Sequence, residues 1–308
     1  MENRIVRLSF QSPVHFGGRR LSDGECTCDA ATLFSALYIE ALNMGCADDL
    51  LCAAKAGEIV FSDAFPYVGE QLYIPKPMVA LARTASPQRQ EPSDSRERKA
   101  SKRLKYIPLT ALDSYLAGTL NFVRELEKFD LGVSFLRTKV NLTRETSDDA
   151  EPYHVGGFSF NPECGIYFIV RGSFDVQPLF EQLGYSGIGG KRSSGYGRFS
   201  AEFASAKPFD GMLETDPAGR SMLLSSSLPR EDELTDVLLE GAKYLLRRKS
   251  GFVQSAAHAA SPRKKRDMWL FEPGSVFVRR FEGDVFDVNV TPGAHAVQRY
   301  ARPMWMEV

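Results

Sequence analysis

The sequence predicts an α+β protein built from two ferredoxin-like (RRM-like) domains, the first with insertions and a glycine-rich loop. The chain opens with a strand, a long loop and a helix. Residues 165–205 close the first domain with a strand, a helix, the glycine-rich loop and a strand, so the whole matches a βαββαβ frame. A linker rich in Pro, Gly and acids at 207–219 precedes a further set of strands. We expect an N-terminal domain over 1–208 and a smaller one over 209–308.

The first half of the N-terminal domain follows simple patterns. Residues 4–10 alternate in polarity, as a strand does. Asp29 can cap a helix over about 30–44, which Gly45 ends. Residues 60–80 are rich in proline and aromatic residues and predict a short pair of strands.

Two insertions interrupt the domain. The basic run 95–105 is expected to be polar and mobile, and helices are predicted at 110–118 and 122–129. Strands at 133–140 and 153–160 flank the acid-rich segment 145–152, which predicts the tip of a hairpin. A strand at 165–172, a helix at 174–184 and a strand at 198–204 complete the domain.

The C-terminal part predicts mostly strands. SMLLSSS at 221–227, SVFVRRF at 275–281, DVFDVNV at 284–290 and AHAVQRY at 294–300 have strand patterns. PREDELTDVLL at 229–239 predicts a short capped helix, and KYLLRRKSGFV at 243–253 fits either a strand or a helix end. The set fits a smaller α+β domain.

Charge is segregated along a chain whose formal net charge is only −1. Residues 95–105 hold six basic residues and one acid, and residues 247–266 hold seven basic residues and no acid. Basic clusters of this kind favour a nucleic-acid path on one face. The five cysteines lack CxxC spacing, and no signal peptide or membrane-length apolar run is present, so we expect a cytoplasmic protein with reduced thiols, no metal and no cofactor.

The glycine-rich loop, GYSGIGGKRSSGYGRFS at 184–200, fits neither common nucleotide motif. Walker A would need Gly at Tyr185 and Ser or Thr at Arg192, and the dinucleotide fingerprint would need Gly at Arg192 and a following helix. What remains is a backbone cradle for phosphate with Lys191 and Arg192 as charges. Ser193 and Ser194 add hydroxyl donors, and Tyr196 could stack on a base. The alternative is a structural turn.

GIGGKRSSGYGRF closely resembles the C-terminal glycine-rich loop of the RAMP superfamily of CRISPR proteins. Other segments are similar to the handle-binding RAMP subunit, the fourth Csm subunit, of type III-A effector complexes, and they follow its order from residue 5 to about 277. They are SPVHFGGRR at 12–20, DAATLFSALYIEA at 29–41, FSDAFPYVG at 61–69, YIPKPM at 73–78, KRLKYIPLTALDSYLAG at 102–118, RTKVNLTRETSDDAEPY at 137–153, GIYFIVRG at 165–172, KSGFVQS at 249–255 and EPGSVF at 272–277. One departure is in the first helix, where the usual Ser-Asp-Thr-Leu-Phe-Ser reads Asp29-Ala30-Ala31-Thr32-Leu33-Phe34-Ser35.

The resemblance implies a non-catalytic subunit that binds the repeat-derived 5′ handle of crRNA. Its implied partners are that RNA, the large polymerase-like subunit and the adjacent backbone RAMP subunit, and its implied "thumb" hairpin lies at 140–153. The resemblance also suggests that RRKSGFVQS faces the handle, although Phe252 taken alone is more simply a core residue. The candidate RNA-binding residues are His15, Phe16, Arg137, Lys139, Gly187, Gly189, Gly190, Lys191, Arg192, Ser193, Ser194, Tyr196, Arg248, Lys249 and Phe252.

Two other functions stay open at this point. RAMP relatives that process guide RNA can use a histidine near His15 as the general base of a metal-independent endoribonuclease. No partner acid or base for His15 is evident in the sequence. The chain could also be an interaction scaffold whose RNA contacts are incidental.

Overall fold

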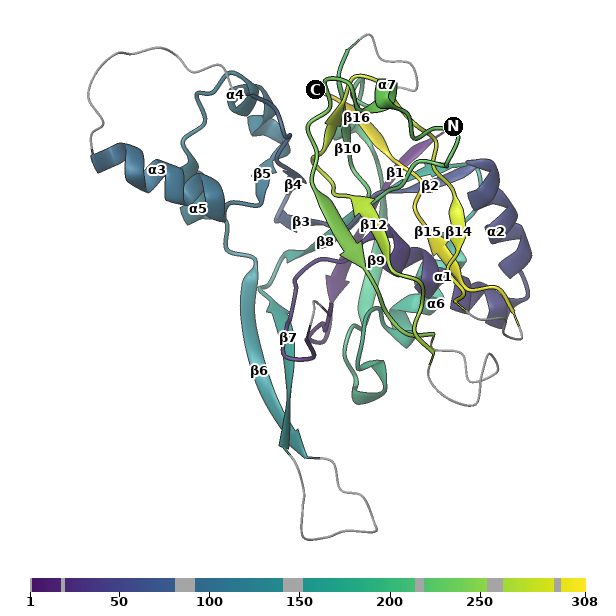
Figure 1. Cartoon of the computed structure of the whole chain (residues 1–308). Coiled ribbons are helices and arrows are strands. Elements are labelled where there is room, and N and C mark those ends of the chain that lie inside the picture. The colour runs from purple at the N-terminus through teal and green to yellow at the C-terminus, as the bar shows by residue number, and fades with distance from the viewer. Residues whose placement is uncertain are drawn as a thin grey trace.

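The computed structural model describes residues 2–17, 20–80, 92–140, 152–213, 219–253, 263–290 and 295–308 (Figure 1). The helices are α1 (Ala30–Met44), α2 (Ala47–Ala56), α3 (Pro92–Arg103), α4 (Leu112–Leu116), α5 (Phe122–Lys128), α6 (Gln177–Ser186) and α7 (Asp236–Leu239), with 3₁₀ turns η1 (Leu109–Ala111), η2 (Arg192–Ser194) and η3 (Lys207–Phe209). The strands are β1 (Asn3–Phe10), β2 (Ile59–Phe61), β3 (Phe65–Val68), β4 (Gln71–Pro75), β5 (Tyr106–Pro108), β6 (Gly132–Val140), β7 (Pro152–Phe160), β8 (Cys164–Gly172), β9 (Phe199–Ser205), β10 (Ser221–Leu223), β11 (Leu246–Lys249), β12 (Met268–Phe271), β13 (Val276–Phe277), β14 (Val285–Asp287), β15 (Gln298–Tyr300) and β16 (Trp305–Glu307).

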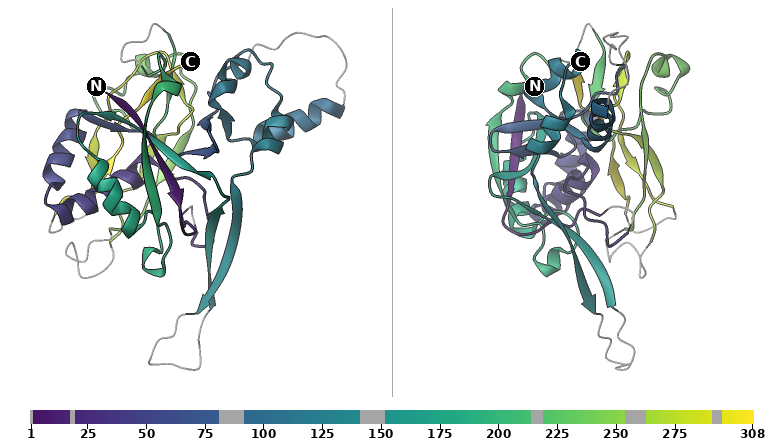
Figure 2. Two further views of the ribbon diagram at one scale, coloured as in Figure 1. Left: turned by 180° about the vertical axis from the view of Figure 1, so that it is seen from behind. Right: turned by 90° about the vertical axis from the view of Figure 1, so that its left-hand side faces the viewer.

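The central antiparallel sheet has the order β5-β4-β3-β8-β1-β9, and β2 also pairs with β8. With β2 and β3 taken as one interrupted strand, this is the order of the predicted βαββαβ frame. Val6 and Phe168 pack with α1 and α6 on one face, where Figure 2 shows α1, α2 and α6 together. On the other face, Ile5 packs in one core with Met222 and Met306 of the C-terminal part. The two parts on either side of the predicted boundary at 208 therefore share a hydrophobic core.

Helix α1 begins and ends where the sequence predicts. The Asp29 carboxylate accepts a hydrogen bond from the Thr32 backbone N–H at 2.8 Å, and Gly45 ends the helix in the left-handed region at φ 76°. These are the usual polar start and glycine stop of a helix. The altered signature thus keeps a capped helix. A second helix that the sequence did not predict, α2, follows directly and packs on α1.

The basic run predicted to be mobile instead forms helix α3 from residue 92 to residue 103. Its Ala100 is buried, and Leu104 just beyond its end is buried in the core shared with the C-terminal part. The Glu97 carboxylate accepts a hydrogen bond from the Phe122 N–H at the start of α5. Two buried apolar residues thus anchor a segment that is otherwise charged, and the sequence did not predict its helix. Helices α3, α4 and α5 project together to one side of the molecule (Figure 1).

Strands β6 and β7 form the predicted hairpin and run antiparallel from the pair Gly132–Phe160 to the pair Val140–Pro152. The stem extends away from the body of the protein (Figures 1 and 2). The acid-rich tip expected at 145–152 lies almost entirely outside the described residues, because the structure describes the chain only to 140 and again from 152.

The C-terminal part holds a three-stranded sheet of order β13-β10-β16 and the separate pairs β11–β12 and β14–β15. Its one helix over the described residues, α7, has four residues and is capped by Thr235. The ambiguous segment at 243–253 contributes a strand, β11, and the sequence did not single out β12 or β16. These strands form no single four-stranded sheet, so a second ferredoxin-like domain is not confirmed.

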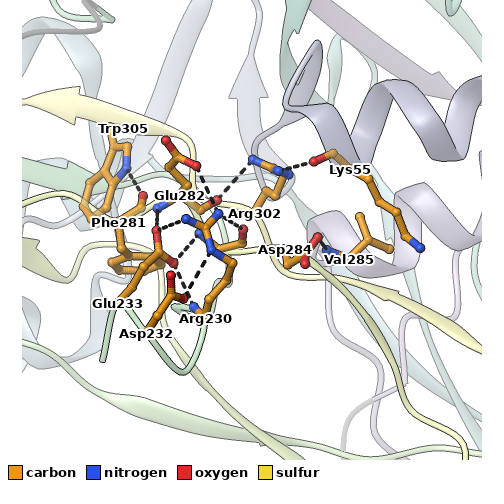
Figure 3. Close-up of polar contacts among 11 residues, drawn as sticks. Lys55, Arg230, Asp232, Glu233, Phe281, Glu282, Asp284, Val285, Arg302 and Trp305 are labelled. Carbon is orange, nitrogen blue, oxygen red and sulfur yellow. Dashed lines mark hydrogen bonds and ion pairs between the residues drawn. The ribbon is translucent and has the colours of Figure 1, made fainter. Parts of the chain in front are cut away.

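Polar contacts tie a turn of the C-terminal part to the rest of the fold (Figure 3). The Arg230 guanidinium pairs with Glu282 at 3.0 Å and with Glu233 at 3.2 Å. Buried Arg302 donates hydrogen bonds to the carbonyl oxygens of Glu282 and of Lys55, which lies in the last turn of α2. A cation beside the carbonyl end of a helix is favourable, so Arg302 fastens the C-terminal part to α2.

Candidate nucleic-acid interface

The glycine-rich loop leaves α6 at Ser186, makes the turn η2 and enters β9 at Phe199. It packs against the segment that follows β1. The N–H groups of Gly190 and Gly197 donate to the carbonyl oxygens of His15 and Pro13 at 2.9 and 2.8 Å. The helix before the loop and the strand after it are as predicted, and the partner segment is the one that carries the candidates His15 and Phe16.

Close packing within the protein explains much of the glycine content. At Gly189 (φ 93°) a Cβ atom would lie 2.9 Å from the His15 carbonyl oxygen, and at Gly197 (φ 79°) 2.1 Å from that of Ile188. The predicted backbone cradle is therefore partly wrong, because several loop N–H groups donate inside the protein. The backbone N–H groups of Lys191, Arg192 and Ser193 donate to no acceptor among the residues that the structure describes. That short stretch is the part of the loop that can face a ligand.

The loop meets the stem of the hairpin. The Lys139 ammonium donates to Ser194 Oγ at 3.1 Å and lies 5.9 Å from the centre of the Tyr196 ring. The Lys191 ammonium lies 5.4 Å from the centre of the Tyr153 ring. These cation–π contacts hold the cations along a partly exposed path. Arg137, which stacks on Phe135 of the same strand, extends that path along β6.

Two predicted aromatic contacts are unavailable. The side chains of Phe16 and Tyr196 are each only 3% exposed. Phe16 lies edge-on to Phe10 in the core of the sheet, and Tyr196 lies beside Phe135. Neither ring can stack on a base, so the predicted stacking role of Tyr196 is corrected to a packing role.

His15 is also largely buried, and its Nδ1 lies 2.7 Å from the carbonyl oxygen of Gly156 on β7. A carbonyl can only accept, so Nδ1 carries a hydrogen and Nε2 is left to accept when the ring is neutral. His15 therefore joins the glycine-rich loop, the segment after β1 and the hairpin stem.

An open cleft of about 1970 Å³ runs between the N-terminal sheet domain and β11 of the C-terminal part. Helix α1 lines it on one side and the segment 245–253 on the other. It gathers a subset of the candidates from distant parts of the chain: His15, Phe16, Gly189, Gly190, Arg192, Arg248, Lys249 and Phe252. The remaining candidates do not line it and belong to the loop and the hairpin stem: Arg137, Lys139, Gly187, Lys191, Ser193, Ser194 and Tyr196.

Lys249 is held by the protein. Its ammonium pairs with the Asp29 carboxylate at the start of α1 and donates to Thr32 Oγ1 at 3.3 Å. Burial raises the pKa of Asp29, but Lys249 and the Thr32 hydrogen bonds outweigh this and lower that pKa to about 2. A second buried carboxyl, that of Asp63, accepts a hydrogen bond from the Ala30 N–H at the start of α1. Burial and the nearby Asp29 charge raise the pKa of Asp63 to about 7. Lys249 thus serves first to join β11 to α1 across the cleft.

Phe252 contradicts the simpler expectation of a core residue, because its side chain is 62% exposed in the cleft. Sequence reasoning missed a second aromatic of this kind, Trp269 on β12, which is 56% exposed. It pairs across the strands with Arg248. Met268 and Leu270 on either side of Trp269 point into the core, but all three residues are apolar, so their pattern carries no signal that the ring is exposed. Exposed aromatic rings beside cations are the usual platform for single-stranded nucleic acid.

Further cations line the cleft that were not among the candidate residues, although all but Arg299 lie in the two basic runs that the sequence singled out. They are Lys102, Lys105, Arg247, Lys265 and Arg299. Over the described residues, no group of three or more His, Cys, Asp and Glu side chains could hold a metal ion. Within the same part of the chain, no helix is long and apolar enough to cross a membrane.

Comparisons with known proteins agree with this architecture. The family model for the CRISPR Csm4 C-terminal domain matches residues 216–308. The chain is 35% identical over 310 residues to the CRISPR system Cms protein Csm4 of Mycobacterium tuberculosis, covering 99% of this chain and 98% of that relative. It is 32% identical over 311 residues to the protein of the same name from Streptococcus thermophilus, covering 100% and 99%.

Two solved structures share the fold. A crystal structure of a Csm3–Csm4 subcomplex in the type III-A CRISPR-Cas interference complex has a TM-score of 0.66 at 17% identity, covering 100% of this chain and 99% of that one. A Csm1–Csm4 cassette in complex with cA4 has a TM-score of 0.61 at 20% identity, covering 100% and 98%. The full-length sequence relatives establish the family and confirm the resemblance to the fourth Csm subunit that the glycine-rich loop and the other segments predict together: the chain belongs to the Csm4 family of type III CRISPR proteins.

Proposed function

We propose that this chain is the non-catalytic subunit of a type III-A Csm effector complex that binds the repeat-derived 5′ handle of crRNA. The observation that carries the proposal is the cleft between the sheet domain and β11. Its walls combine the cations Arg192 and Arg248 with the exposed rings of Phe252 and Trp269. Phosphate contacts supply affinity, and stacking holds unpaired bases without requiring a duplex.

The hairpin stem and the glycine-rich loop extend this surface beyond the cleft. Lys139 and Lys191 are held over aromatic rings, so their charges are already oriented before RNA binds. We propose that the guide leaves the cleft along this path and reaches the hairpin, which serves as the thumb. The aromatic contacts of Lys139 and Lys191 restrict these two side chains before RNA binds, which reduces the entropy lost on binding.

The protein partners are part of the same proposal. The relatives of similar fold are a Csm3–Csm4 subcomplex and a Csm1–Csm4 cassette. We propose that this chain likewise meets a backbone RAMP subunit and the large polymerase-like subunit, and that RNA and protein surfaces are contiguous.

Nuclease protection tests the proposal. The complex is reconstituted with and without this chain, treated with a single-strand nuclease, and the 5′ ends of the surviving RNA are sequenced. We expect the handle to survive only in the complete complex. Equal protection of the handle in the complex that lacks this chain would contradict the proposal.

A further inference from the structure

Lys265 lies in the C-terminal wall of the cleft, just before β12. Its backbone is fixed, because its N–H donates to the Gly251 carbonyl oxygen at 2.8 Å and the next N–H, of Arg266, donates to Val288 at 2.8 Å. Its side chain is half-buried and lines the cleft. Within the described residues its ammonium has no acceptor, so three N–H donors face a partly desolvated space without a partner.

The surroundings of Lys265 are cationic. Burial lowers the pKa of Lys265, and so do the charges of Arg299 and Lys249. Arg299 is only 4% exposed and donates to the carbonyl oxygens of Lys249, Ser250 and Arg266. Carbonyl groups solvate a guanidinium but do not neutralise it. Arg299 therefore fixes the backbone at the end of β11 and adds a buried positive charge that Asp29 and Asp267 offset only in part, because both carboxylates also pair with other cations.

The nearby carboxylates are already engaged. Asp29 pairs with Lys249, and Asp267 pairs with Lys264 at 3.1 Å and with Arg248 at 3.9 Å. Five cations (Arg248, Lys249, Lys264, Lys265 and Arg299) then share two carboxylates (Asp29 and Asp267), which leaves an excess of 5 − 2 = 3 positive charges. Half-buried charges of like sign are unfavourable for folding alone. An arrangement of this kind is stabilised when an anion enters.

We propose that Lys265 anchors a phosphate subsite and binds one backbone phosphate of RNA, an inference that rests on the proposed function. Arg299 is its positioning residue, since it holds the carbonyl groups of the segment 249–250 that faces Lys265. The exposed rings of Phe252 and Trp269 line the same cleft and favour a nucleotide over an acidic peptide. The sequence-derived candidates did not include this subsite.

The test compares the full chain with Lys265→Met and with the matched control Lys264→Met, whose exposed ammonium is already paired with Asp267. Binding of a synthetic handle oligonucleotide is measured by fluorescence anisotropy across a salt series. On single-stranded RNA, the loss of one phosphate contact makes the plot of log K against log [salt] less steep by about 0.7. We expect that change for Lys265→Met, a smaller one for Lys264→Met, and a retained slope for Lys265→Arg.

Single methylphosphonate substitutions then identify the phosphate. One position is expected to weaken binding by the wild-type chain and to have no further effect on Lys265→Met. Lys265→Met is also expected to keep or raise the melting temperature, because it removes an ammonium that Arg299 and Lys249 repel. If Lys265 instead stabilised the fold, the same substitution would lower the melting temperature.

The outcomes separate the two proposals. In one outcome, the wild-type chain prefers the handle to a scrambled oligonucleotide, the salt slope of Lys265→Met is unchanged, and no methylphosphonate position loses its effect in Lys265→Met. The phosphate subsite is then wrong, and the proposed function stands. If wild type shows no preference for the handle, the proposed function is wrong, and coupling between Lys265 and a phosphate of the scrambled RNA still supports the subsite. Loss of binding to poly-glutamate alone would overturn the choice of RNA as ligand.

Discussion

The ion pair between Asp29 and Lys249 joins the two walls of the cleft, and Asp29→Asn tests its contribution. Asp29 is 8% exposed and Lys249 is 30% exposed. Breaking a fully buried pair costs about 3–5 kcal/mol. Because water can solvate part of the freed Lys249 charge, we expect Asp29→Asn to lower the free energy of unfolding by about 2 kcal/mol. Asparagine still caps α1, so Asp29→Ala should cost about 1 kcal/mol more.

The cost of Asp29→Asn should depend on pH through Asp63. Burial and the Asp29 charge raise the pKa of Asp63 to about 7, well above its ordinary value in an unfolded chain. The folded protein therefore binds this proton more tightly, and the stability it contributes is full below about pH 4 and is lost as pH rises through 7. Asp29→Asn removes the repulsion and lowers the Asp63 pKa. The cost of the substitution should therefore be larger at pH 5 than at pH 8.

Urea unfolding at both pH values measures this, with the fluorescence of Trp269 and Trp305, the only two tryptophans, as the signal. Glu70→Gln is the matched control, since it removes the carboxylate of an ion pair with Arg7 in which Glu70 is 92% exposed. No measurable change is expected there. Equal stability of wild type and Asp29→Asn, or the same cost at pH 5 and pH 8, would refute the reasoning.

Three further predictions concern RNA. Lys191→Ala combined with Arg192→Ala should weaken handle binding and lower the salt slope by up to about 1.4, measured by anisotropy; an unchanged slope would exclude a phosphate role for both cations. Phe252→Ala and Trp269→Ala should each cost about 1–3 kcal/mol of RNA binding if each ring stacks on one base, while the salt slope stays constant. The purified wild-type chain should not cleave repeat RNA in EDTA; site-specific cleavage that His15→Ala abolishes would instead make it a ribonuclease.

Local signals in the sequence predicted the elements that local physics controls. The polar start at Asp29 and the stop at Gly45 located α1, and alternation located β1 and β6. The order helix, glycine-rich loop, strand was likewise predicted. Each of these depends on residues within a few positions of one another.

Features that depend on tertiary packing were not predictable in the same way. Helix α3 is held by Ala100, which a count of charges overlooks. Tyr196 looked like a stacking residue because it lies in a basic loop, yet Lys139 and the hairpin stem cover it. Phe252 looked like a core residue by composition, yet it lies just beyond β11, in an isolated bridge with Lys264, and its ring is exposed. For Tyr196, the ring is covered by the hairpin stem, which lies about sixty residues earlier in the chain.

Photocrosslinking tests the central claim, that the cleft between the sheet domain and β11 holds the guide's 5′ handle. 4-Thiouridine is placed at single handle positions in the reconstituted complex, and crosslinked peptides of this chain are identified by mass spectrometry. We expect handle nucleotides to crosslink to the 245–253 segment and to the glycine-rich loop. Handle crosslinks confined to surfaces outside the cleft, with 245–253 unmodified, would contradict it.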